Sequence, residues 1–150
     1  MTIISFASTS EGISIVHTTG KKNSFAILYH IRIAIVPGNW VALAKSIESL
    51  IESRYKADKI SQCIVVKAGA GKYAASPDTY KAEGIIEFVI GSLGLAAAHI
   101  SKQSLAKGLG CAKKEKWQER AKSMFNNQGS IKGFSQGFDA ACAGAWSLAS

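Results

Sequence analysis

The chain has 150 residues, 47% hydrophobic and 19% charged, a composition that excludes disordered and fibrous proteins. This length suits one domain with a buried core, so we expect residues 1–150 to form a single domain. Eighteen Lys and Arg residues against ten Asp and Glu residues give a net charge of +8, which is compatible with a polyanionic partner.

The first part of the chain predicts three antiparallel strands. Residues 3–7 and 13–18 are β-favouring runs, and the small polar segment between them ends in Gly12, as hairpin loops often do. After a second turn at residues 19–23, residues 25–36 alternate, with Phe25, Tyr29 and four isoleucines on one face and His30 and Arg32 on the other. We therefore expect a meander whose third strand has one buried face.

Helices and strands alternate in the rest of the chain. Asn39 is a candidate N-cap, and apolar residues then recur at helical spacing from Trp40 to Tyr55, which predicts an amphipathic helix. Residues 63–66 and 95–100 are expected to form buried strands, and Ser76 with Pro77 is typical of a helix start. Further helices are expected at residues 101–108, 113–127 and 135–148. The order β-β-β-α-β-α-β-α-α-α predicts an α/β fold with a mixed five-stranded sheet and helices on both faces.

The cysteines bear on the cellular compartment. Cys63, Cys111 and Cys142 are an odd number with no closely spaced pair, which favours buried, reduced thiols over disulfides or a zinc site. We see no secretory leader, and no apolar window is long enough to cross a membrane. We expect a cytoplasmic protein without a membrane partner.

Most of the positive charge is concentrated in one segment. Residues 101–132 carry eight basic residues against Glu115 and Glu119, a local balance of 8 − 2 = +6. Such a run is either a solvated helical face or a surface that binds phosphates. Lys67 and Lys72 flank a glycine-containing loop that either meets an anion or simply joins a strand to a helix. The candidate nucleic-acid-binding residues are Lys67, Lys72, Lys102, Lys107, Lys113, Lys114, Lys116, Arg120 and Lys122.

Three segments, together with the element order, resemble the RuvC-like branch of the RNase H-like superfamily, which contains Holliday-junction resolvases. Residues 3–16 resemble the first hairpin of this branch. Residues 63–67, with residues 71–74 and 81–86, resemble its second motif of strand, loop and helix. Residues 139–143 read D-A-A-C-A and resemble the D-A-A-D-A of its closing helix. The resemblance covers nearly the whole chain.

The resemblance implies phosphodiester hydrolysis by two Mg²⁺ ions, which the family holds with carboxylates from the first strand, the fourth strand and the last helix. Here the first-strand position falls at Ala7 or Ser8, the fourth-strand position on Lys67, and the closing helix keeps Asp139 but has Cys142 in place of its second aspartate. One carboxylate does not hold two divalent ions, and a lysine beside it repels them. We expect either that the Lys67 ammonium replaces the charge of the metal and pairs with Asp139, or that Lys67 points to solvent and Asp139 only lies near the start of its helix.

The sequence therefore predicts an RNase H-like domain that has lost its metal centre and binds DNA or RNA without cleaving it. Two alternatives stay open: a protein-interaction or homodimerisation module, and a residual nuclease with a reorganised site. A cofactor, Mg²⁺, is expected only for the second alternative, in which Glu11, Glu83 or Glu87 would have to replace the missing ligands.

Overall fold

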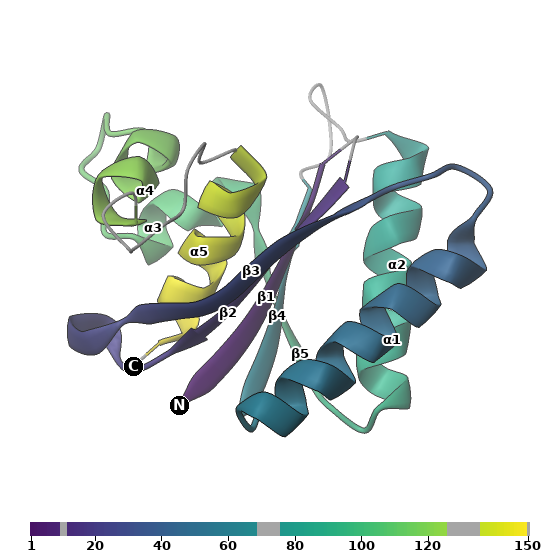
Figure 1. Ribbon diagram of the computed structural model, residues 1–150. Coiled ribbons are helices and arrows are strands. Elements are labelled where there is room, and N and C mark those ends of the chain that lie inside the picture. Colours follow the sequence, from purple (N-terminus) through teal and green to yellow (C-terminus); the bar gives the residue numbers. More distant parts are fainter. Residues whose placement is uncertain (10–11, 69–75, 126–135, 150) are drawn as a thin grey trace.

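The computed structural model describes residues 1–9, 12–68, 76–125 and 136–149, and shows a twisted sheet between two layers of helices (Figure 1). The five strands are β1 (Thr2–Ser8), β2 (Gly12–Thr19), β3 (Ala26–Ala34), β4 (Gln62–Lys67) and β5 (Ala97–Ser101), in the order β3-β2-β1-β4-β5. The β1–β2 and β2–β3 pairs are antiparallel, whereas β1–β4 and β4–β5 are parallel. The predicted mixed sheet is confirmed.

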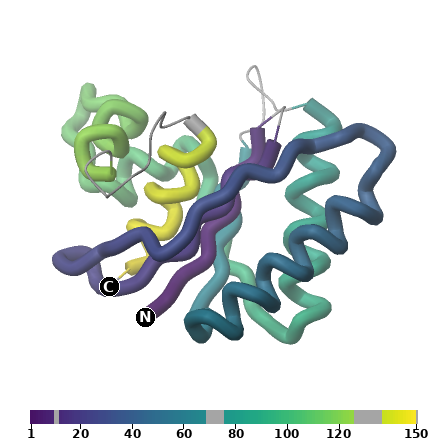
Figure 2. The backbone as a smooth tube through the Cα atoms, viewed as in Figure 1, coloured from purple at the N-terminus to yellow at the C-terminus, as the bar shows by residue number. Residues whose placement is uncertain are grey.

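Helices cover both faces of this sheet. One face carries α1 (Trp40–Ala57) and α2 (Pro77–Ser92), and the other carries α3 (Leu105–Gly108), α4 (Trp117–Phe125) and α5 (Gln136–Leu148) (Figure 1). Short 3₁₀ turns occupy Lys22–Ser24 and Lys102–Ser104. Figure 2 shows that α5 starts at the end of the sheet where β1 and β4 finish, and that both chain termini lie near the opposite end. No described helix is long and apolar enough to span a bilayer.

Local sequence signals account for most of these boundaries. The Ser76 hydroxyl accepts a hydrogen bond from the Thr79 amide, and Pro77 opens α2, as predicted. Asn39 does occupy the N-cap position of α1, but its side chain makes no capping bond. The helix predicted over residues 113–127 begins only at Trp117, because residues 112–115 form a turn in which the Glu115 amide donates to the Ala112 carbonyl.

Two apolar cores lie on the two faces of the sheet. One contains the inward residues of α1 and α2, and the other contains the alanine-rich α5 with the inner residues of α4. Residues 63–66 of β4 are all buried, which confirms a strand covered on both faces. The small side chains of α5 let it approach closely, since a Cβ atom at Gly144 would lie 2.6 Å from Cγ2 of Val66.

The predicted alternation of β3 is wrong at one point. The pairing passes from His17–Tyr29 directly to Thr18–Ile27, so β3 contains one extra residue, Leu28, at a bulge. Because strand side chains alternate between faces, the extra residue reverses the alternation. Phe25 and Ile27 therefore pack against the α5 core, whereas the later isoleucines of β3 pack towards α1.

Candidate nucleic-acid interface and the carboxyl edge of the sheet

Three strands end side by side at one edge of the sheet. Ala7 of β1 lies opposite Val66 of β4, and Lys67 of β4 lies opposite Ser101 of β5, so Ser8, Lys67 and Ser101 terminate neighbouring parallel strands. We call this the carboxyl edge. In open α/β sheets this is the edge where ligands generally bind. Ser8 is only 1% exposed, and its hydroxyl has no hydrogen-bond partner among the described residues.

The first turn of α5 lies over the same end of the sheet. Ser14, which pairs with Ala7 across β1 and β2, sits so close to α5 that a Cβ atom at Gly137 would be 2.3 Å from its hydroxyl oxygen. Ala7 and Cys142 share the buried core beneath α5. The structure thus brings Ala7, Asp139 and Cys142 to one face of the sheet, and Ser8 and Lys67 to its carboxyl edge.

Asp139 is a buried carboxylate, and one of its two oxygens has no hydrogen-bond partner among the described residues. Its side chain is 1% exposed, and its Oδ1 atom accepts no hydrogen bond from any described residue. Burial raises the pKa of Asp139 to about 6, and the positive charge of Lys122 on α4 offsets part of that rise. Lys122, which belongs to the basic run of residues 101–132, therefore interacts electrostatically with this carboxylate.

Lys67 does not pair with Asp139, and the expected ion pair between them is not formed. The Lys67 ammonium instead pairs with the Glu87 carboxylate of α2, and Nε2 of His99 on β5 lies 2.8 Å from the same oxygen, Oε1. The reason is strand geometry, since Val66 faces the α5 core and the next residue points to the opposite face, where α2 lies.

Glu83 and Lys102 complete the carboxyl edge. Glu83 of α2 is 3% exposed, and its Oε1 accepts a hydrogen bond of 2.7 Å from the Ala68 amide just after β4. Burial raises the pKa of Glu83, whereas the Ala68 amide and the charges of Lys67 and Lys102 lower it. The half-buried Lys102 ammonium lies 3.4 Å from the carbonyl oxygen of Ser8, and burial lowers its pKa while Glu83 raises it.

Sequence reasoning assigned these residues incompletely. It considered Glu83 and Glu87 only as replacement metal ligands, and it grouped Lys102 with the surface lysines. A signal was present for the acidic pair, because residues four apart on a helix share one face and this helix follows β4 directly. The partnership of Lys102 with Ser8 joins residues 94 positions apart, and no local pattern reveals it.

The other candidate basic residues that the structure describes are all exposed, and they come from α3, α4 and the turn between them. Figure 1 shows these two helices on the α5 side of the sheet. The residues are Lys107 on α3, Lys113, Lys114 and Lys116 in the following turn, and Arg120 and Lys122 on α4. We call this set the basic surface. Arg120 lies 3.8 Å from the Glu115 carboxylate, which offsets only part of the charge. Lys72 and its glycine-containing loop lie outside the described residues.

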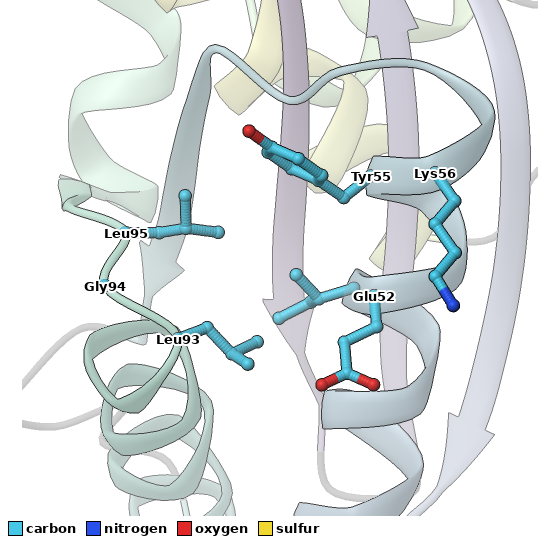
Figure 3. A pocket seen from close by; sticks show the side chains of 7 residues that line it. Glu52, Tyr55, Lys56, Leu93, Gly94 and Leu95 are labelled. Carbon is cyan, nitrogen blue, oxygen red and sulfur yellow. The ribbon is translucent and has the colours of Figure 1, made fainter.

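A pocket of about 660 Å³ opens at the other end of the sheet (Figure 3). Leu93 and Leu95, at the turn from α2 into β5, face Tyr55 of α1, while Glu52 and Lys56 stand on the α1 side. This pocket is at the amino end of β5, so it is separate from the carboxyl edge.

Across the described ranges, no three His, Cys, Asp or Glu side chains gather closely enough to hold a metal ion.

Solved structures similar to this fold include Holliday-junction resolvases. RuvC of Thermus thermophilus superposes with a TM-score of 0.73 at 12% identity, covering 98% of this chain and 92% of that one. The same protein in complex with a Holliday-junction substrate gives a TM-score of 0.71 at 11% identity, covering 98% and 91%. The yeast mitochondrial Holliday-junction resolvase Ydc2 gives 0.64 at 10% identity, covering 97% and 77%.

Sequence comparison adds no closer relative. No protein-family profile matches the chain, and no curated protein matches it. Structural likeness at such low identity establishes the fold, and the chain has a RuvC-like, RNase H-like fold, as the sequence motifs predicted. Function has to be argued from the chain's own residues.

Proposed function

We propose that this chain is a noncatalytic RuvC-like domain that binds DNA or RNA through the basic surface. The observation that carries the proposal is that all six side chains of this surface are exposed on one side of the sheet, in a chain of net charge +8. Clustered basic side chains bind phosphates without base specificity. The fold supports the proposal, since one of its structural neighbours was solved with a Holliday junction.

The residues at the carboxyl edge do not fit a pair of Mg²⁺ ions. Each such ion needs near-octahedral oxygen ligation and compensating negative charge. Ser8 Oγ and Asp139 Oδ1 are buried oxygens without hydrogen-bond partners among the described residues, and they include one carboxylate. The other two carboxylates there already have partners, since Glu83 accepts from the Ala68 amide and Glu87 pairs with Lys67. The neighbouring positions hold the Lys67 ammonium and the Cys142 thiol, and burial raises the pKa of that thiol, so it stays protonated. We therefore derive no hydrolytic step for this domain.

Salt-dependent binding tests the proposal. A fluorescein-labelled duplex and single strands of DNA and RNA are titrated by fluorescence anisotropy between about 50 and about 200 mM salt, because released counterions make phosphate contacts steeply salt-dependent. We expect K114Q/K116Q/K122Q to weaken binding and to lower the slope of log K against log salt by about 2 to 3. The matched control K45Q/K56Q/K59Q removes the same charge from exposed positions on and just after α1. Equal effects of the two triple variants would contradict a localised interface.

Cleavage assays test the noncatalytic part of the proposal. Branched DNA and RNA–DNA hybrids are incubated with the protein and Mg²⁺ or Mn²⁺, and we expect no product. Cleavage that the Asp139→Ala variant abolishes would establish the residual nuclease instead.

A protein-interaction or homodimerisation module is the second candidate function, and one observation favours it. Phe88 on the outer side of α2 is 73% exposed and Tyr80, two turns earlier on the same side, is 40% exposed. Exposed aromatic side chains at helical spacing are typical of interaction sites. Sedimentation velocity of the wild type and of Phe88→Ser tests this candidate. If it is right, the wild type sediments as an assembly and the Phe88→Ser variant dissociates.

The cysteines support a cytoplasmic location for this proposed nucleic-acid-binding domain. All three are free thiols, and Cys63 and Cys142 are buried. Unpaired cysteines are the usual state in reducing compartments.

A further inference from the structure

Lys102 differs from the members of the basic surface. Those six side chains are exposed, whereas Lys102 is partly buried and its ammonium reaches the Ser8 carbonyl oxygen at 3.4 Å. Lys102 follows β5, and β4 lies between β5 and β1, so its side chain crosses the end of β4 to reach β1. An amine held at the ends of three strands is part of the carboxyl edge.

The carboxyl edge balances its charges without a metal. Glu83 lies buried beside Ala68, and its carboxylate interacts electrostatically with the ammonium groups of Lys67 and Lys102. Glu87 pairs with Lys67 and lies within 2.8 Å of His99. Two carboxylates therefore face two lysines, and both lysines come from the ends of strands.

At the carboxyl edge, an ammonium group and a divalent ion would both supply positive charge, but the two would repel each other. Both attract the oxygens of a phosphodiester, and a lysine is a common point-charge phosphate binder. A divalent ion brought beside Lys102 would be repelled by it. Lys102 has three N–H donors, and the Ser8 carbonyl accepts from only one of them. The remaining donors suit a phosphate oxygen.

We propose that Lys102 is a resident cation that replaces the divalent ion at the carboxyl edge and binds a phosphodiester oxygen of the nucleic acid without any metal. This inference rests on the proposed function for its ligand. Its metal-replacement part concerns the protein alone and is tested separately.

Binding in EDTA tests the phosphate contact. The wild type, Lys102→Met, Lys102→Arg and Lys107→Met are titrated with the same labelled duplex at one salt concentration. We expect Lys102→Met to weaken binding by at least about tenfold, because a hydrogen bond to a charged group is lost, and Lys107→Met to weaken it less, because Lys107 is exposed. Lys102→Arg keeps the charge and is expected to retain most of the affinity. Equal losses in the two methionine variants would overturn the contact.

Thermal unfolding with and without divalent ions tests the replacement. Mn²⁺ is expected to leave the unfolding midpoint of the wild type and of Lys102→Arg at its value in EDTA. The same ion should raise the midpoint of Lys102→Met, since Glu83 is then left buried without that compensating charge. A rise in the wild type, or none in Lys102→Met, would overturn the replacement.

The two arms separate the possible failures. If no variant binds nucleic acid at low salt, the proposed function fails while the Mn²⁺ measurement still decides whether Lys102 stands in for a divalent ion. If Lys102→Met does not fold, the absence of a Mn²⁺ response in the wild type and in the folded Lys102→Arg protein supports the replacement, and a midpoint that rises in both contradicts it.

Discussion

The Asp139→Asn substitution should stabilise the protein at neutral and higher pH. Burial raises the pKa of Asp139 from 3.8 to about 6, so ionising this carboxylate costs the folded state more than the unfolded state. A difference of this size corresponds to about 3 kcal/mol, at about 1.4 kcal/mol for each pH unit. Asparagine avoids the charge but still buries an amide, so we expect a net gain of about 1 to 2 kcal/mol.

The pH dependence of this gain follows from the direction of the pKa shift. Below pH 3.8 Asp139 is protonated in both states and imposes no electrostatic penalty. The penalty develops as the pH rises from 3.8 to about 6 and is complete above that value. The advantage of Asp139→Asn should therefore be absent in acid and constant at alkaline pH.

Urea unfolding of both proteins at about pH 4, 6 and 8 measures the difference in free energy. Other titrating groups are common to the two proteins and cancel from that difference. Asp78→Asn is the matched control, since Asp78 lies in the first turn of α2 and only favours that helix, so its loss should cost about 0.3 to 1 kcal/mol. An Asp139→Asn protein less stable than the wild type at pH 8, or a difference independent of pH, would refute the inference that burial makes ionisation of Asp139 unfavourable in the folded state.

Two further predictions concern stability. Burial, with a contribution from Arg54, lowers the pKa of His17 from 6.5 to about 4. The free energy of unfolding of the wild type should therefore fall by up to about 3 kcal/mol as the pH falls from 6.5 to about 4. In urea unfolding, His17→Gln should show a smaller fall over the same pH range. Gly144→Ala would place a Cβ atom 2.6 Å from Val66 Cγ2 and should cost about 1 to 2 kcal/mol by thermal unfolding. Gly91→Ala is the control, because a Cβ atom at Gly91 would have no neighbour within 4 Å, and it should raise the free energy of unfolding by up to about 1 kcal/mol. Similar effects of the two substitutions would contradict the close contact between α5 and the sheet.

The order and type of the elements were predictable because they depend on local patterns. Strand alternation, helical spacing and the Ser76–Pro77 start are properties of short segments, and each reappears in the structure. The bulge at Leu28 was not predictable in this way. Unbroken alternation from Phe25 onwards fits one continuous face, and only pairing with β2 reveals that Phe25 and Ile27 belong to the other core.

The candidate site was predictable as a set of positions but not as a set of contacts. The resemblance placed Ser8 and Lys67 at neighbouring strand ends and Asp139 at the start of the last helix, where the structure has them. It did not indicate the direction in which Lys67 points. That direction depends on Val66 facing α5, which leaves α2 and its Glu87 as the partner of Lys67.

The basic residues show why the type of a side chain is a weaker guide than its surroundings. Seven basic residues between positions 102 and 122 look equivalent in the sequence, and six of them are exposed. Lys102 is instead partly buried, and its ammonium interacts with two groups that are distant in the sequence, the Ser8 carbonyl and the Glu83 carboxylate. A buried cation is costly unless such groups compensate it. Lys102 and Glu83 therefore compensate each other in part, and removing either should leave the other with less compensation for its burial at the carboxyl edge.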